Sequence, residues 1–147
     1  MAYPLQSNRY VSAHNLRGNG ETVLVIDDEV VLVEIATISL ELSGYKVISA
    51  SDGIEGIQRF LEYKDTVSAV VCDWNMPHMG GNSAIQSILY ARPDMKIIIV
   101  SGSMEFNAAE HLPGSTNAIF LQKPYRSEKL LEALHYLLNQ ESVVVRK

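Results

Sequence analysis

The sequence contains a single cysteine, Cys72, among its 147 residues. One thiol excludes a disulfide within the chain and a metal site built from several cysteines. Free thiols persist in reducing compartments, so we expect a cytoplasmic location.

Long hydrophobic runs are absent as well. No apolar stretch approaches the ~20 residues that a transmembrane helix needs. Residues 1–20 have no apolar core of the kind that signal peptides carry. We therefore expect no membrane contact by this chain and no secretory signal.

Positive charge is scarce, because 12 Lys and Arg residues face 17 Asp and Glu residues, for a net charge of −5. Nucleic-acid binding needs clustered Lys and Arg, so this balance argues against a nucleic acid as the direct partner. The hydrophobic content of 47% and charged content of 20% are typical of one globular domain with its own core.

The chain divides into three predicted parts. Residues 1–20 are polar, lack periodicity and end in RGNG, which indicates a linker or arm. Residues 21–140 form the folded domain, and residues 141–147 form a C-terminal tail.

Within the domain, short β-branched runs alternate with segments of helical periodicity. We expect strands at 22–26, 45–50, 67–73, 96–101 and 118–122. Apolar residues at helical spacing mark four helices. The first contains Val31, Ile35, Ile38 and Leu42 and ends near Gly44, and the second starts near Asp52 and contains Ile54, Ile57 and Leu61. Two later helices contain Ile85, Ile88 and Leu89, and Leu130, Leu134 and Leu137. A further helix, the fourth of five, is expected within 104–112, where the apolar pattern is weakest.

The strands are continuous apolar runs, which is the pattern of a parallel sheet covered by helices on both faces. The predicted fold is therefore α/β, a doubly wound five-stranded parallel sheet of order 2-1-3-4-5 with five helices. Ligands of such sheets bind beyond the carboxyl ends of the strands.

Those strand ends carry polar residues. The first strand ends in Asp27 and Asp28, the third in Asp73, the fourth in Ser101 and the fifth in Lys123. Because the first and third strands are neighbours in this order, three carboxylates would converge and repel one another. A divalent cation with oxygen ligands relieves that repulsion, and Mg²⁺ suits the site, with Mn²⁺ as an alternative.

Such a constellation supports phosphoryl transfer. A carboxylate is already ionised at neutral pH and can attack a phosphoryl group to form an acyl phosphate. The metal ion and Lys123 would offset the charge on the transferred oxygens.

Four motifs identify a family resemblance: VLVIDDE (23–29), VVCDWNMPHMGG (70–81), VSGS (100–103) and IFLQKP (119–124). They occur in the order and spacing of the receiver domain of bacterial two-component response regulators, which the chain resembles from about Glu21 to Asn139. The resemblance implies a flavodoxin-like, CheY-like fold and a signalling domain rather than a classical enzyme.

The resemblance also implies roles for individual residues. Asp73 would be phosphorylated by a histidine kinase, a phosphotransfer domain or a small acyl phosphate. Asp28, Asp73 and the backbone carbonyl of Asn75 would bind Mg²⁺ directly, and Asp27 mainly through water. Lys123 would pair with the acceptor or with its phosphoryl oxygens.

Further implied roles concern switching. Ser101 would move toward the phosphoryl group, and Phe120 would turn inward behind it, repacking the fourth helix, the fifth strand and the fifth helix. Pro77 would end the acceptor segment, and Lys123–Pro124 would be a cis peptide bond. An unknown output partner and a phosphorylation-dependent dimer belong to the same expectation.

The sequence departs from the family pattern at two glycines. Gly80–Gly81 stands where Asp-Gly is common, which should loosen the start of the third helix. Gly56 lies inside the second helix, where it costs about 1 kcal/mol relative to alanine.

Single residues also have ordinary explanations. Asp27 and Asp28 could cap a helix, Ser101 could be a turn residue, and Phe120 could be a core residue. Cys72 is expected to be a buried small residue, and Trp74 a surface aromatic at the rim of the acidic site. His14 lies in a segment similar to histidine-phosphotransfer sites, but that chemistry needs a four-helix bundle.

Two other classes share parts of this pattern. A phosphohydrolase of the haloacid dehalogenase type also uses an aspartyl phosphate, but it needs an acid two positions later, where this chain has Asn75. A flavodoxin-like cofactor binder needs a phosphate-binding loop after the first strand, which is not seen.

Two contexts remain open. The junction RGNGETVLVIDDE resembles the entry to the C-terminal receiver of hybrid sensor histidine kinases, and we favour that context. A stand-alone single-domain response regulator is the alternative.

Overall fold

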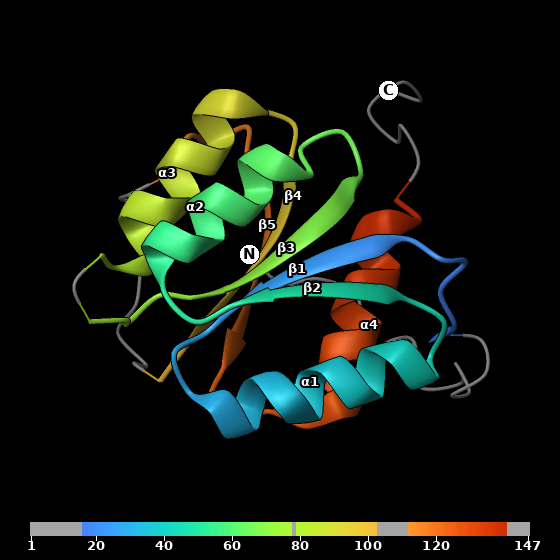
Figure 1. Ribbon diagram of the computed structural model, residues 1–147. Helices are drawn as coiled ribbons and strands as arrows, with labels where there is room; N and C mark the ends of the chain where they lie inside the picture. Colours follow the sequence, from blue (N-terminus) through green and yellow to red (C-terminus); the bar gives the residue numbers. More distant parts are fainter. Residues whose placement is uncertain (1–15, 78, 103–111, 141–147) are drawn as a thin grey trace.

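The computed structural model describes residues 16–77, 79–102 and 112–140. In these residues five strands and four helices follow one another (Figure 1): β1 (Thr22–Ile26), α1 (Val30–Leu42), β2 (Lys46–Ala50), α2 (Gly53–Glu62), β3 (Val67–Asp73), α3 (Gly81–Ala91), β4 (Lys96–Ser101), β5 (Asn117–Gln122) and α4 (Ser127–Leu138). The helix expected within 104–112 lies almost entirely outside the described residues, as do the tail at 141–147 and most of the predicted arm, including His14.

The five strands form one parallel sheet of order β2-β1-β3-β4-β5. This confirms the predicted fold class and strand order. The strand bounds differ from the predicted ones by at most one residue, because each strand is a short, mainly apolar run between polar or glycine-containing segments.

Residues that alternate along the strands belong to two separate hydrophobic cores, one on each face of the sheet. Leu24, Ile26, Val70, Cys72 and Ile97 pack beneath α2 and α3 on one face of the sheet. Their neighbours Val23, Val25, Val71, Ile98 and Val100 pack beneath α1 and α4 on the other (Figure 1). Central strands buried on both faces must be apolar at every position, which explains their continuous runs.

Helix α1 is predicted correctly, but its marker residues face outward. Val31 is 64% exposed and Leu42 74% exposed, whereas Ala36 and Leu40 are buried against the sheet. Because α1 is apolar on nearly every side, helical spacing identifies the helix without identifying its buried face.

Helix α2 begins with reciprocal capping. Asp52 Oδ1 accepts the N–H of Glu55 at 2.7 Å, and Glu55 Oε1 accepts the N–H of Ser51 at 2.7 Å. Gly56 lies where α2 closely approaches β1, since a Cβ there would stand 2.6 Å from Cδ1 of Ile26. The glycine therefore lowers helix propensity but permits this close packing.

Across the described residues, no helix combines the length and apolar character needed to cross a membrane.

The glycine that follows α1 generates the first prediction. Gly44 has φ +95°, and a Cβ there would stand 2.7 Å from the carbonyl oxygen of Gly18. Gly44→Ala should lower the free energy of unfolding by more than the ~1–2 kcal/mol of left-handed strain alone. Urea denaturation measures this loss.

Gly20→Ala is the matched control. Gly20 has φ +87°, but a Cβ added there would meet no atom within 4 Å, so this variant should show only the strain. Equal losses in the two variants would contradict a role for the close approach between Gly44 and Gly18.

Candidate functional site

The carboxyl ends of the strands bring polar side chains to one edge of the sheet. Asp27 follows β1, Asp73 ends β3, Ser101 ends β4 and Lys123 follows β5. Backbone bonds extend the ladder past the strands: the N–H of Asp27 donates to Ala50 at 3.1 Å, and the N–H of Lys123 donates to Ser101 at 2.8 Å. The side chains therefore project from rigid backbone.

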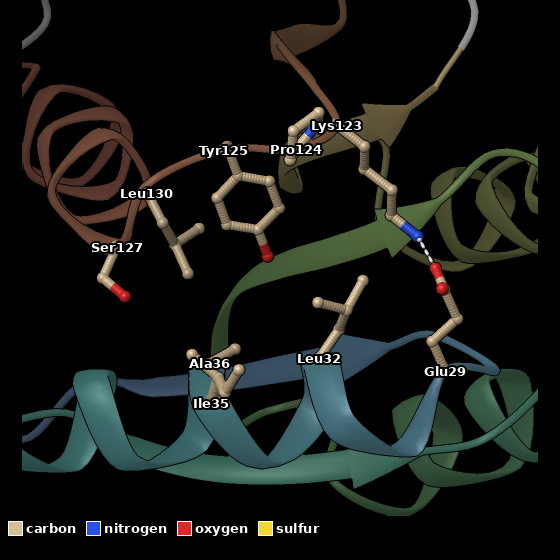
Figure 2. A pocket seen from close by; sticks show the side chains of 9 residues that line it. All are labelled: Glu29, Leu32, Ile35, Ala36, Lys123, Pro124, Tyr125, Ser127 and Leu130. Atoms are coloured by element: carbon tan, nitrogen blue, oxygen red, sulfur yellow. Dashed lines mark hydrogen bonds and ion pairs between the residues drawn. The ribbon is translucent and has the colours of Figure 1, made fainter.

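The ammonium group of Lys123 is at the centre of this cluster. Its Nζ lies 2.6 Å from Glu29 Oε1, 3.1 Å from Asp27 Oδ2 and 3.1 Å from Asp73 Oδ2. Figure 2 shows the pair formed with Glu29. One cation thus offsets three carboxylates.

Asp27 and Asp73 are buried, with exposed fractions of 6% and 4%. The second oxygen of each accepts a backbone N–H: Asp27 Oδ1 from Glu29 at 2.9 Å, and Asp73 Oδ1 from Asn75 at 3.1 Å. These bonds compensate part of the cost of removing charge from water. Asp27 accepts the N–H of the residue before α1 and does not cap the helix; the N-cap is Glu29, without a side-chain bond.

Asn75 and Ser101 form a polar pair beside Asp73. Asn75 Nδ2 donates to Ser101 Oγ at 3.2 Å, and Ser101 is buried. Ser101 therefore lies beside the cluster that contains Asp73, and its hydroxyl accepts a hydrogen bond from Asn75, whose N–H also donates to Asp73.

Burial and charge shift the pKa values of the central pair. Burial raises the pKa of the Asp73 carboxyl, and Asp27 raises it further, while the Asn75 N–H and Lys123 offset part of the shift. Burial alone would lower the pKa of Lys123, but its hydrogen bonds to Glu29 and Asp27 raise it well above the usual value. Lys123 therefore stays protonated, and the ionised form of Asp73 is disfavoured.

The donor set suits a hard divalent cation. Carboxylate oxygens of Asp27, Glu29 and Asp73 lie within 4.8 Å of one another. Oxygen ligands at this spacing fit Mg²⁺ or Mn²⁺ better than a soft metal. Asp28, expected to be a direct ligand, is half-buried and does not belong to this group, whereas Glu29 does.

The two glycines that precede and begin α3 have unequal roles. Gly81 donates its N–H to the carbonyl of Trp74 at 3.0 Å, and a Cβ at Gly81 would run into the Asp73 carbonyl oxygen and stand 2.7 Å from the Trp74 Cα. Gly80 has room, since the nearest atom to its Cβ position is 3.7 Å away. Gly81 thus lets α3 begin against the backbone of Asp73 and Trp74, while Gly80 leaves α3 without a side-chain cap.

The remaining expected residues lie on the strands that carry the cluster or on the segments that follow them. Phe120 lies on β5 with 37% of its surface exposed, and Pro77 is exposed after buried Met76. The Lys123–Pro124 peptide bond is cis, as expected. Trp74, expected as a surface aromatic at the rim of the acidic site, is half-buried and packs in part against the core under α2 and α3. Cys72 is fully buried, and burial raises the pKa of its thiol, so it is a core residue as predicted.

A cleft of about 410 Å³ opens beside the cluster, between α1 and α4 (Figure 2). Apolar side chains of Leu32, Ala36 and Leu130 line it together with the ring of Tyr125. The Lys123–Glu29 pair stands at one end of this cleft and links the start of α1 to the chain after β5.

Glu29 is the member of the cluster that sequence reasoning missed. It is the third consecutive acid in VLVIDDE, and that run was the available signal. The expected site included the residues directly after each strand, up to Asp28. Glu29 was not expected there, because its contact with Lys123 depends on the direction of its side chain, which the sequence does not show.

Known proteins share these features over most of the chain. The family model of the response regulator receiver domain matches residues 23–135. The sensor kinase CckA of Brucella abortus (strain 2308) is 32% identical over 129 residues, covering 88% of this chain but 14% of that protein. The chemotaxis protein CheY of Treponema pallidum (strain Nichols) is 29% identical over 139 residues, covering 92% of this chain and 95% of that protein.

A solved structure agrees with the sequence relatives. The crystal structure of a response regulator receiver domain protein from Clostridium thermocellum superposes with a TM-score of 0.76 at 28% identity, covering 84% of this chain and 98% of that one. The strand order, the acidic cluster with its lysine and the match over residues 23–135 lead to one conclusion: the chain belongs to the response regulator receiver domain family of two-component phosphorelay systems.

Proposed function

We propose that this receiver domain is a phosphorylation-driven switch whose acceptor is Asp73. The observation that carries the proposal is the contact of buried Asp73 with Lys123 at 3.1 Å, inside a cluster of carboxylates at the sheet edge. Carboxylates held in this way, buried and beside another negative charge, are found preferentially at functional sites, which supports the proposal.

In the proposed step, one oxygen of Asp73 attacks the phosphorus of a phosphohistidine or of a small acyl phosphate. An O–P bond forms, and the bond from phosphorus to the leaving imidazole nitrogen or acetate oxygen breaks with its electron pair. The attacking group is a carboxylate, which carries no proton, so this step needs no general base. The donor would be a histidine kinase or a phosphotransfer domain.

The residues around Asp73 have distinct proposed tasks. Lys123 would offset charge on the phosphoryl oxygens, and the Asn75 N–H would hold the acceptor oxygen in place. Asp27, Asp28, Asp73 and the Asn75 carbonyl would hold Mg²⁺, with Mn²⁺ as an alternative. When bound, the ion supplies charge neutralisation for an incoming anion.

The proposed output is a change on the face formed by β5, α4 and the segment between β4 and β5. Ser101 would move from its partner Asn75 toward the phosphoryl group, and Phe120, now 37% exposed, would turn inward. The output partner and a phosphorylation-dependent dimer remain predictions.

Two further questions concern context and class. We favour a receiver module of a hybrid sensor kinase, which the similarity to CckA supports, over a stand-alone regulator, which the similarity to CheY supports. The length of the natural protein decides between them. A phosphohydrolase is disfavoured because Asn75 is not an acid and its amide donates to Ser101.

Phosphoryl transfer is tested directly by incubation with acetyl phosphate and Mg²⁺. The intact chain should gain the mass of one phosphoryl group, and Asp73→Asn should gain none, because the nucleophilic oxygen is lost. Asp65→Asn, at an exposed aspartate, is the matched control and should behave as the parent. Phosphorylation of Asp73→Asn would refute the acceptor assignment, and steady turnover of phosphomonoesters would favour the phosphohydrolase.

Metal binding is tested with Trp74, the one tryptophan of the chain, which directly follows Asp73. Mg²⁺ should change its fluorescence saturably, and EDTA should reverse the change. Asp27→Asn should weaken the apparent affinity about tenfold or more, since a charged ligand is lost. Glu34→Gln, on an exposed position of α1, should change it little. No fluorescence change at saturating metal would contradict the site.

The raised pKa of Asp73 predicts a pH-dependent stability difference. When the pKa of a carboxyl is higher in the folded than in the unfolded state, ionisation of that carboxyl lowers the free energy of unfolding. The loss is absent below the pKa of the unfolded state and complete above the pKa of the folded state. Without metal, Asp73→Asn should therefore be more stable than the parent at pH 7, and this gain should vanish as pH falls below about 4. Thermal unfolding in EDTA measures the difference; a less stable variant at pH 7 would contradict it.

A further inference from the structure

Glu29 makes the shortest of the three contacts of Lys123, at 2.6 Å. The two side chains differ in exposure, since that of Glu29 is 57% exposed and that of Lys123 only 16%. The other two partners, Asp27 and Asp73, are buried. Lys123 therefore has two partners shielded from water and one at the rim.

The backbone of Glu29 is anchored on both sides. Its N–H donates to Asp27 Oδ1 at 2.9 Å, and its carbonyl accepts the N–H of Val33 at 3.1 Å as α1 begins. These two backbone bonds do not involve the Glu29 carboxylate, so its contact with Lys123 can break while they persist.

The donor capacity of Lys123 is full. An ammonium group has three N–H donors, and three carboxylates surround Nζ within 3.1 Å. A phosphoryl group on Asp73 would add oxygens that need the same donors. Phosphorylation converts the Asp73 carboxylate into an acyl phosphate, so the donor that Asp73 holds can pass to a phosphoryl oxygen. A second donor for the phosphoryl group can come only from the contact with Asp27 or with Glu29.

Glu29 is the carboxylate that can leave at the least cost. Its exposed oxygens regain water when the contact breaks, whereas Asp27 would be left buried and unpaired.

We propose that Glu29 is a positioning residue that competes with the phosphoryl group for Lys123. It holds the ammonium in the unphosphorylated chain and releases it when Asp73 is phosphorylated. The inference rests on the proposed function and names a regulator of the same site: Glu29 slows phosphorylation and weakens retention of the phosphoryl group. Its release also breaks the link between the start of α1 and the chain after β5.

The test uses beryllium trifluoride, an anionic phosphoryl analogue, with Trp74 fluorescence as the readout at Mg²⁺ concentrations that saturate each variant. Glu29→Gln should bind the analogue about two- to fivefold more tightly, the range expected for one partly exposed ion pair. Its phosphorylation by acetyl phosphate should accelerate by a similar factor. Both differences should shrink as salt is raised, because the competing contact is partly exposed to screening ions.

Two further variants separate the contact from a general charge effect. Glu34→Gln removes the same charge from an exposed position of α1 and should match the parent. Glu29→Asp keeps the charge but shortens the side chain, so loss of the contact should make it resemble Glu29→Gln. If Glu29→Asp binds the analogue as the parent does and Glu29→Gln binds it more tightly, the negative charge at position 29 is responsible, and the inference of competition for Lys123 is overturned.

Three other results would overturn the inference. Weaker analogue binding by Glu29→Gln overturns the inference and assigns Glu29 to support of the bound metal or anion. An unchanged affinity and rate in Glu29→Gln overturns the inference alone, provided that the parent is phosphorylated. A parent that gains no phosphoryl mass overturns the proposed function and this inference together.

Discussion

Two carboxylates of this domain are almost completely removed from water, and their burial depends on the ammonium group of Lys123. Asp27 and Asp73 come from adjacent strands and would repel each other without a shared cation. Lys123 follows β5, the edge strand that lies two positions from β3, so the site forms only with this strand order. Loss of that cation would leave two buried charges unpaired, which is far more costly than losing a surface ion pair.

The same contacts that stabilise the resting chain also oppose the proposed reaction. Lys123 has no spare donor while Asp27, Glu29 and Asp73 hold it, and Asp73 is a buried charge beside a like charge. A phosphoryl group or a divalent cation would change this balance, because either one brings new charge into a partly buried site. A site with such competing contacts is suited to switching, since small changes in charge redistribute them.

Close backbone packing keeps Asp73 in place. Gly81 lets α3 start against the carbonyl of Asp73, and the N–H of Asn75 holds one carboxylate oxygen. The departure at Gly80 has no steric cost and removes only a helix cap. The position of the Asp73 carboxylate is thus set by the backbone on one side and by Lys123 on the other.

The sequence alone determined the fold, because continuous β-branched runs and polar strand ends follow from burial on two faces of a parallel sheet. It also determined that Asp27, Asp73, Ser101 and Lys123 meet at one edge. Only the tertiary structure decided that Glu29 joins Lys123, that Gly81 must lack a side chain, and which side of α1 is buried. The first two outcomes depend on side-chain directions and on approaches of a few ångströms between segments that are distant in the sequence. The third depends on packing, because a helix that is apolar on nearly every side does not show by the spacing of its residues which side is buried.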